Sequence, residues 1–295
     1  MIKRTLYFGN PAYLNIQLNQ LIISVKDRDT KKSVPIEDIA IVILDHPQIT
    51  ITHTVIRKLL DNNVALLSCD QKHMPSGLML PLEGNYTQSK VQQQQINASI
   101  ILKKQLWQQT VTAKISNQKK LLMKLGLPYK KLEVLEKRVK SGDPTNVEGQ
   151  AAAYYWPVLF ENFIRDRYGL PPNNLLNYGY IILRSMVARA LISSGMLPTL
   201  GIFHKNQYNA FGLADDIMEP FRPYIDFIVY QHHLQHPDEV FLDKAAKVAL
   251  LNVCTTDAYF NKKRRPLMVG LSQTTRSLAR CFSGERRKIV YPEFE

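Results

Sequence analysis

An acidic cluster in the second half of the sequence has the residue types and the spacing of a divalent-metal site. Asp215 and Glu219 lie four residues apart, and Asp216 and Glu219 lie three apart, so either aspartate could share a helix face with Glu219. Like charges at this spacing destabilise a helix unless a cation lies between them. The pattern therefore indicates a metal ion or an arginine, and Arg222 is the competing partner for Glu219. The spacing does not decide between Asp215 and Asp216.

Two further candidate ligands precede this cluster. His204 follows the apolar segment 197–203, where a lone histidine is more often structural, but the acids that follow favour a ligand role. Glu148 stands at the start of an expected helix, and Thr145-x-x-Glu148 has the form of a capping box, in which the glutamate only satisfies the helix end. Gly149 and the three alanines after Gln150 instead indicate a thin helix face that DNA or another helix could approach. The residues support both interpretations of Glu148 equally.

The charge distribution favours chemistry on nucleic acid. The chain has a net charge of +13, and residues 86–140 hold 12 Lys and Arg against 2 Asp and Glu. The following block, residues 141–255, is acidic, with 8 basic against 11 acidic residues. Cations hold phosphates, while a carboxylate cluster holds the ion that does the chemistry. The sequence therefore indicates a metal-dependent nucleic-acid enzyme, although a basic surface alone would give the same net charge.

Composition excludes several other classes of protein. With 295 residues, 45% of them hydrophobic and 21% charged, the chain can form a globular core. The longest strongly apolar run, Ile39–Leu44, is far shorter than the roughly 20 residues that cross a bilayer, and the first eight residues lack a signal-peptide core. Three scattered cysteines form no disulfide framework. We expect a cytoplasmic protein without a membrane partner.

The first 75 residues favour strands. Short apolar or alternating runs are separated by turn-forming residues, including those at 9–11, 19–20 and 27–30. We expect strands at 2–8, 13–17, 21–26, 39–44 and 64–68, and a helix at 52–61. The uninterrupted run Ile39–Leu44 is typical of a strand buried on both faces.

The remainder of the chain favours helices. Residues 71–85 are rich in proline and glycine, and apolar residues at helical spacing follow them. We expect helices at 87–125, 132–139, 147–168, 178–194, 213–230 and 240–253, with Pro220 kinking the fifth of these. The fold class is α+β, with a small N-terminal β-rich domain at 1–75, a linker at 76–85 and a larger all-α domain at 86–295.

Lysines follow the first of these helices and favour a role in DNA binding. Their density could track the backbone of a duplex, whereas the alternative is an ordinary solvated surface. The six lysines are Lys103, Lys104, Lys114, Lys119, Lys120 and Lys124. We expect this face to contact nucleic acid.

Four stretches of the sequence resemble the CRISPR-associated integrases of spacer acquisition, the first-numbered proteins of those systems. The stretches are Asn146–Tyr155, Asn177–Tyr180, His204–Asn206 and Leu213–Pro223. The Glu-Pro-Phe-Arg-Pro string and the chain length are similar to the type II branch. The resemblance covers essentially the whole chain, including the order of the β-rich and helical parts.

The resemblance implies a catalytic site and its metal. It implies that Glu148, His204 and Glu219 bind Mg²⁺ or Mn²⁺, and that Asp216 is an additional catalytic acid. It favours Asp216 over Asp215, which the spacing left undecided. Many relatives carry aspartate where Glu219 stands, and either carboxylate binds these ions.

The resemblance also implies the partners. The family forms homodimers, two of which flank a dimer of a small second adaptation protein, and the β-rich domain is expected to serve dimerisation and partner docking. Double-stranded DNA is expected in two forms, the captured fragment and the CRISPR repeat. Type II relatives also involve the effector nuclease and an end-binding ring protein. Cations at 86–140 and 256–295 are expected to hold the DNA backbone.

The resulting hypothesis is a DNA integrase that joins the 3′-hydroxyl ends of captured DNA to the repeat of a CRISPR array. A structure-specific, metal-dependent endonuclease is the second possibility, because cleavage and strand transfer differ only in whether water or a 3′-hydroxyl attacks. A non-catalytic DNA-binding scaffold is the third.

Overall fold

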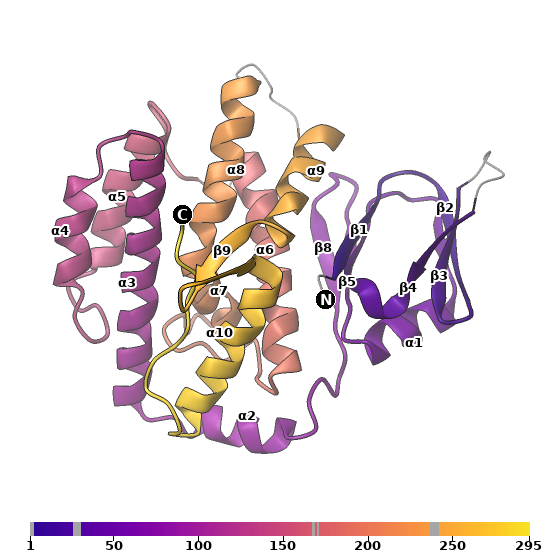
Figure 1. Cartoon of the computed structure of the whole chain (residues 1–295), viewed down its shortest axis with the longest axis horizontal. Coiled ribbons are helices and arrows are strands. Elements are labelled where there is room, and N and C mark those ends of the chain that lie inside the picture. Colours follow the sequence, from indigo (N-terminus) through magenta and orange to yellow (C-terminus); the bar gives the residue numbers. More distant parts are fainter. Residues whose placement is uncertain (1–2, 26–30, 167–168, 170, 237–241) are drawn as a thin grey trace. The chain divides into compact units, whose positions relative to one another are not determined.

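A computed structural model of the chain describes residues 3–25, 31–166, 169, 171–236 and 242–295. The chain divides into two compact units, Met1–Tyr86 and Thr87–Glu295 (Figure 1). The first unit is rich in strands and the second is mainly helical. The predicted α+β class and the order of the two parts are confirmed.

Unit 1 consists of two four-stranded sheets and one helix. The first sheet has the order β1-β5-β7-β8, with β1, β5 and β7 parallel and β8 antiparallel. The second has the order β4-β3-β2-β6. The bounds are Arg4–Phe8 (β1), Ala12–Gln17 (β2), Gln20–Val25 (β3), Lys31–Pro35 (β4), Ile36–Asp38 (a 3₁₀ turn, η1), Ile39–Leu44 (β5), Ile49–Ile51 (β6), His53–Asp61 (α1), Ala65–Cys69 (β7) and Pro75–Met79 (β8).

The core of unit 1 follows from the apolar runs of the sequence. Strand β5 lies between β1 and β7, and its residues 39–43 are all buried, which confirms the prediction of a strand covered on both faces. The amphipathic helix α1 turns Val55 and Leu59 into the same core as Leu14 and Leu21 of the other sheet. Burying apolar faces from both sheets and α1 together stabilises this unit.

Three strands of unit 1 were not predicted. Strands β4, β6 and β8 are short, and β4 and β8 contain lysine, serine or glycine instead of an apolar alternation. All three lie at sheet edges, where one side of the strand needs no partner and the hydrophobic signal is weak. Strand β8 overlaps the expected linker at 76–85. The expected turn at 27–30 lies outside the described residues.

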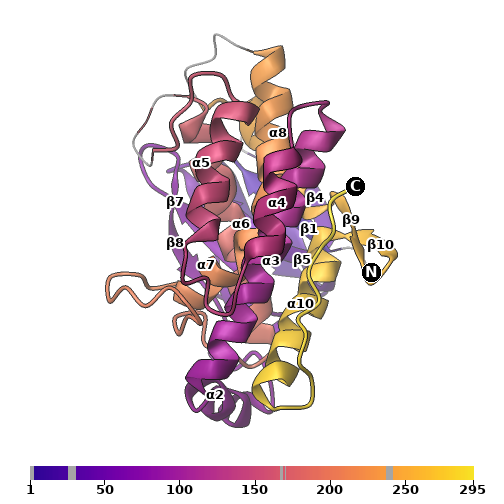
Figure 2. The same cartoon turned by 90° about the vertical axis from the view of Figure 1, so that its left-hand side faces the viewer.

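Unit 2 is a helical assembly with one added hairpin. Its elements are Gln88–Ile96 (α2), Ile100–Lys124 (α3), Lys130–Arg138 (α4), Val147–Leu159 (α5), Asn173–Ser193 (α6), Gly212–Met218 (α7), Glu219–Phe221 (a 3₁₀ turn, η2), Arg222–Gln235 (α8), Lys244–Leu251 (α9), Asn252–Cys254 (a 3₁₀ turn, η3), Asp257–Phe260 (β9), Lys263–Pro266 (β10) and Leu267–Phe282 (α10). Helix α3 packs beside α4 and α5 (Figure 2).

Helix α6 is the core helix of unit 2. It contacts α7, α8, α9 and α10. Gly179 permits the approach of α8, because a side chain there would lie 2.5 Å from Ile225. Among the described residues, α6 is the one helix long and apolar enough to span a membrane, and 72% of its apolar window is buried in the protein, as in a core helix.

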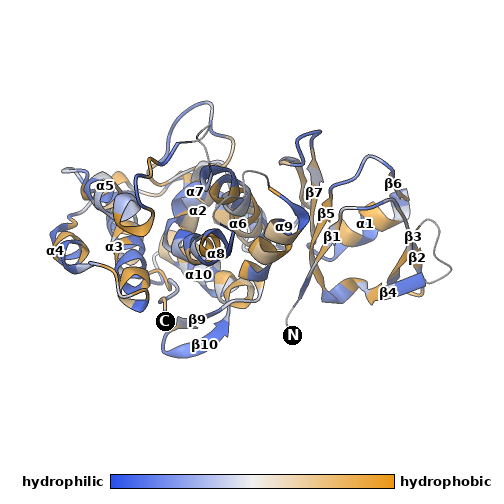
Figure 3. Ribbon diagram, turned by 90° about the horizontal axis from the view of Figure 1, so that it is seen from above, coloured by the Kyte–Doolittle hydropathy of each residue, from blue (hydrophilic) through white to orange (hydrophobic). Residues whose placement is uncertain are grey.

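The predicted helices of unit 2 are present with shifted ends. The segment 87–125 is two helices, because Ser99 caps the start of α3 by accepting a hydrogen bond from Leu102 N. The expected kink at Pro220 is the 3₁₀ turn η2 between α7 and α8. The β9–β10 hairpin and α10 were not predicted, so unit 2 is not purely helical. Strand β10 carries Lys263 and Arg264 and is hydrophilic along its length (Figure 3).

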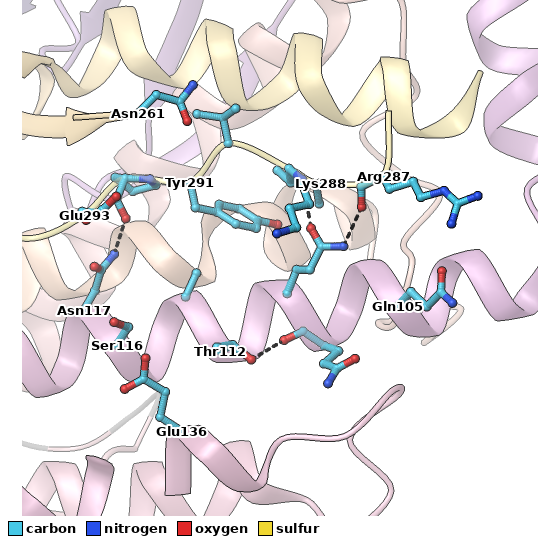
Figure 4. A pocket seen from close by; sticks show the side chains of 16 residues that line it. Gln105, Thr112, Ser116, Asn117, Glu136, Asn261, Arg287, Lys288, Tyr291 and Glu293 are labelled. Carbon is cyan, nitrogen blue, oxygen red and sulfur yellow. Dashed lines mark hydrogen bonds between the residues drawn. The ribbon is translucent and has the colours of Figure 1, made fainter. Parts of the chain in front are cut away.

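The C-terminal segment, residues 287–294, runs along α3 beside a groove of about 710 Å³ (Figure 4). Side-chain amides of α3 hold its backbone. Gln109 donates to Arg287 O and accepts from Ile289 N, each at 2.9 Å. Asn117 donates to Pro292 O and accepts from Phe294 N, and also donates to Pro220 O at 2.7 Å. Asn117 therefore joins α3 and the C-terminal segment to the turn that carries Glu219.

Candidate active site

The start of α5 leaves the Glu148 side chain available for another partner. The helix is capped by Asn146, which adopts a left-handed conformation and accepts from Gly149 N. Asp143 accepts from Val147 N at 2.8 Å and from Glu148 N at 3.0 Å. The capping box expected from Thr145 and Glu148 is therefore not the cap that forms, because Asp143 and Asn146 already satisfy these amides.

Glu148 and Glu219 converge on the same cation. Lys114 Nζ of α3 lies 2.6 Å from Glu148 Oε1 and 2.6 Å from Glu219 Oε2. The Lys114 side chain is 9% exposed and that of Glu219 only 4%. Burial works to lower the pKa of Lys114, but the negative charges of Glu219 and Glu148 outweigh it, so the net shift is upward.

Glu219 has cations on both of its oxygens. Arg222 Nη2 lies 2.8 Å from Glu219 Oε1, so the arginine predicted as a competitor of the metal is indeed a partner. Burial works to raise the pKa of Glu219, but Arg222 and Lys114 outweigh it and lower the pKa. Glu219 Oε2 forms its ion pair with Lys114. Glu219 is thus held ionised between two cations.

Asp216 fixes the position of His204. One Asp216 oxygen accepts from the backbone N–H groups of Ile202 and Phe203. The other accepts from His204 N at 3.1 Å and lies 2.6 Å from His204 Nδ1. A carboxylate only accepts, so Nδ1 carries the proton and Nε2 is left to act as a ligand.

The loop that carries His204 packs tightly against Asp216. A side chain at Gly201 would lie 2.4 Å from His204 O and 2.9 Å from Asp216 Oδ2. The hydrogen bond that His204 donates to Asp216 raises the pKa of His204, burial partly opposes this rise, and the charges of Asp216, Glu219 and Glu148 add to it. The negative charges of both glutamates therefore favour the protonated form of His204.

Two aromatic rings form the wall beside His204. Trp107 of α3 stacks on Phe203 with ring centroids 4.1 Å apart and an interplanar angle of 2°. Its ring also meets the edge of His204, with centroids 5.8 Å apart. These two rings limit the orientations open to the imidazole of His204. Helix α3 supplies both Trp107 and Lys114 to the site.

Asp215 binds residues other than those of the candidate metal site. It accepts from Arg184 Nε at 2.6 Å and Arg184 Nη2 at 3.0 Å, and from Asn209 Nδ2 at 2.8 Å. This bidentate pair attaches α7 to α6. The two adjacent aspartates thus have separate tasks, and Asp216, not Asp215, faces the histidine.

The donor set fits a hard divalent ion. Within the described ranges, no three Asp, Glu, His or Cys side chains are close enough to form a complete metal cluster. A cation nevertheless already bridges Glu148 and Glu219, and His204 presents Nε2. Two carboxylates and an imidazole are ligands that Mg²⁺ and Mn²⁺ accept. Lys114 is the residue of this site whose role sequence reasoning missed.

A second buried carboxylate lies next to the site. Asp226 of α8 accepts hydrogen bonds from the hydroxyls of Tyr155 and Tyr180. Burial raises the pKa of Asp226 from its ordinary 3.8 to about 6, against the opposing effects of the two hydroxyls and of Arg222. The Arg222 guanidinium lies 4.7 Å from the centre of the Tyr180 ring, so it contacts both carboxylate clusters.

Four of the six lysines of α3 have partners within the protein. Lys114 is buried in the site, Lys119 pairs with Glu136, Lys120 pairs with Glu293 and Lys124 donates to Glu295 O. Lys104 of the same helix is exposed, and the expectation that this face contacts nucleic acid stays a prediction. Further exposed cations lie toward the C-terminus, at Lys262, Lys263, Arg264, Arg276, Arg280, Arg287 and Lys288.

Comparison with known sequences gives a consistent set of relatives. A sequence model of the family described as CRISPR associated protein Cas1 matches residues 6–252. The CRISPR-associated endonuclease Cas1 of Neisseria meningitidis serogroup C (strain 8013) is 41% identical over 232 residues, covering 78% of this chain and 75% of that protein.

Solved structures share the fold at low sequence identity. A casposase bound to integration product superposes with a TM-score of 0.81 at 21% identity, covering 100% of this chain and 95% of that one. A CAS1 protein from Thermotoga maritima gives a TM-score of 0.72 at 16% identity, covering 95% and 97%. A chain of a Cas6-RT-Cas1–Cas2 complex gives 0.73 at 21% identity, covering 100% of this chain and 36% of that one.

Proposed function

Because this chain belongs to the Cas1 family of CRISPR-associated endonucleases and integrases, it is a DNA-processing enzyme, and we propose that Glu148, His204 and Glu219 bind its divalent metal. The observation that carries the proposal is the convergence of Glu148 and Glu219 on one cation position, and Asp216 holds His204 with its Nε2 free. The reaction is the joining of 3′-hydroxyl ends of captured DNA to the repeat of a CRISPR array. Mg²⁺ and Mn²⁺ are the candidate ions, because the donors are hard oxygens and one imidazole.

The residues of the site have distinct roles in this reaction. A bound divalent ion would polarise the phosphodiester and stabilise the charge that develops as a 3′-hydroxyl attacks. Asp216 holds His204 in the tautomer that leaves Nε2 free, and Arg222 keeps Glu219 ionised and oriented. Fixed charges of this kind reduce the reorganisation that the reaction requires.

The partners we propose are double-stranded DNA and other adaptation proteins. The exposed cations within residues 86–140 and 256–295 would hold phosphates, with affinity that falls as salt rises. A Cas1–Cas2 complex among the similar structures supports a small second adaptation protein as partner. We further propose a homodimer formed through the β-rich unit, a cytoplasmic location, and contact with the type II effector nuclease and ring protein.

The test is a strand-transfer assay with the second adaptation protein, a labelled short duplex and a supercoiled plasmid that carries the repeat. Glu148→Ala should lower joined product on the order of 100-fold or more, and adding a chelator should do the same. Glu133→Ala is the matched control, because this exposed glutamate of α4 pairs with Lys137 and with no other cation among the described residues, and it should retain wild-type activity.

Other outcomes would assign a different function. Cut plasmid without joined product would indicate the endonuclease. Spacer joining that survives both Glu148→Ala and the chelator would contradict the proposed site. Binding of DNA without cutting or joining, unchanged by either treatment, would indicate a scaffold.

A further inference from the structure

Lys114 differs from the other lysines of its helix. Lys119, Lys120 and Lys124 each contact a single acidic residue, whereas Lys114 contacts two carboxylates that are both candidate metal ligands. The contact with Glu219 oxygen Oε2 is one that a metal ion would need. A divalent ion and the Lys114 ammonium would therefore compete for the same oxygen.

The two glutamates are matched by two cations before any metal binds. Glu148 and Glu219 face Lys114 and Arg222. A divalent ion would add two positive charges within contact distance of an ammonium in a largely buried site, and such like charges repel strongly. Movement of one of the two side-chain cations away from the site would relieve this repulsion.

Lys114 is the cation that can move. Arg222 holds Glu219 Oε1 while its guanidinium covers the Tyr180 ring at 4.7 Å, so two contacts fix its position. Lys114 has a flexible four-carbon side chain, and both of its short contacts, at 2.6 Å, are to the candidate ligands. When a metal occupies these carboxylates, Lys114 loses the interactions that hold it.

We propose that Lys114 is an internal counter-ion that occupies the carboxylate pair Glu148 and Glu219 and is displaced when a divalent metal binds. This inference rests on the proposed metal site. It assigns Lys114 as a positioning residue: the ammonium holds the two carboxylates in place and keeps the affinity for metal low. The free energy of metal binding then includes the cost of displacing the Lys114 ammonium from the two carboxylates.

The test is titration of metal-stripped protein with Mn²⁺, followed by electron paramagnetic resonance and by the shift in melting temperature. Lys114→Gln removes the charge but keeps an N–H donor for the carboxylates, so the fold is retained. We expect it to bind Mn²⁺ at least tenfold more tightly than the wild type, and Mn²⁺ to raise its melting temperature by more. Lys114→Arg keeps the charge and should show no gain in affinity.

The matched control is Lys119→Gln on the same helix. Lys119 forms an equally short, partly buried pair with Glu136, so its loss tests the general effect of removing a lysine from α3. Its Mn²⁺ affinity should equal that of the wild type. Unchanged or weaker Mn²⁺ binding by Lys114→Gln overturns the inference alone. Failure of every protein, wild type included, to bind Mn²⁺ overturns the proposed metal site as well.

Discussion

The buried carboxylates Glu219 and Asp226 lie close together in the sequence, yet the fold handles their charges in opposite ways. Glu219 faces two cations, Lys114 and Arg222, and its pKa is lowered despite burial. Asp226 faces two tyrosine hydroxyls, and burial raises its pKa to about 6. A carboxylate that is neutralised in part by a displaceable ammonium, as Glu219 is by Lys114, can bind a metal ion in its place. One satisfied by fixed hydroxyls contributes to the core instead.

Arg222 connects the two regions. Its guanidinium pairs with Glu219 and covers the Tyr180 ring, whose hydroxyl binds Asp226. The packing around Asp226 therefore positions Arg222, which is one of the two cations that face Glu219. The buried core beside the candidate metal site thus contributes to the electrostatics of that site.

Removing Arg222 should have the largest effect. Arg222→Met leaves the buried Glu219 carboxylate with Lys114 alone and exposes the Tyr180 ring, so we expect the free energy of unfolding to fall by about 3 kcal/mol. Chemical denaturation measures this loss. The control is Arg57→Met, whose exposed pair with Asp61 should contribute less than about 1 kcal/mol. Equal losses of unfolding free energy in the two variants would contradict a larger contribution from the buried Arg222 than from the exposed Arg57.

Asp226→Asn should change how stability depends on pH. The raised pKa means that folded Asp226 binds its proton more tightly than the unfolded chain does. This contribution is complete below about pH 4 and is lost as pH rises through about 6. Relative to the variant, the wild type should lose up to about 3 kcal/mol of unfolding free energy between about pH 4 and pH 7.

The measurement for Asp226 is denaturation in chelator at several pH values, so that metal binding does not contribute. Asparagine can still accept from one tyrosine and donate to the other, so the network is retained. Parallel pH profiles for the two proteins would show that Asp226 titrates normally and would remove the contrast with Glu219.

Asp216 is a third kind of buried carboxylate, held by backbone N–H groups and an imidazole. Asp216→Asn places an amide N–H against these donors and should weaken Mn²⁺ binding about 10- to 100-fold by releasing His204. Calorimetric titration measures the affinity. Asp215→Asn is the adjacent control, because Asp215 binds Arg184, and we expect it to lower stability while leaving Mn²⁺ affinity near that of the wild type.

Tyr155→Phe should have the smallest effect. It removes one hydrogen bond that favours ionised Asp226, so the pKa of Asp226 should rise further and stability at about pH 8 should fall by about 1 kcal/mol. A double-mutant cycle with Asp226→Asn isolates the interaction. A coupling energy near zero would show that the hydroxyl does not stabilise the charge.

Local sequence signals predicted much of the fold. The apolar run at 39–44 gave the central strand, helical spacing gave the helices around the site, and Pro220 marked the turn between α7 and α8. Elements with weak apolar periodicity, such as the edge strand β4 and the β9–β10 hairpin, were missed because pairing partners define them. The periodicity of apolar residues is a property of the segment itself, whereas the pairing of a strand depends on other segments of the chain.

The same distinction between local signals and contacts of distant segments applies to the candidate site. Residue types and spacing predicted a set of acids and a histidine and their chemical class, because the spacing of Asp215, Asp216 and Glu219 is a local property of one chain segment, and the family resemblance selected among them. The folded structure was needed to show that Asp143 and Asn146 cap α5 and free Glu148, that Asp215 binds Arg184, and that Lys114 lies between two glutamates. The register of α3 in the core turns Lys114 inward, while Lys119 and Lys120 meet acids nearer the surface. Such contacts depend on packing between residues far apart in the chain, which no local pattern encodes.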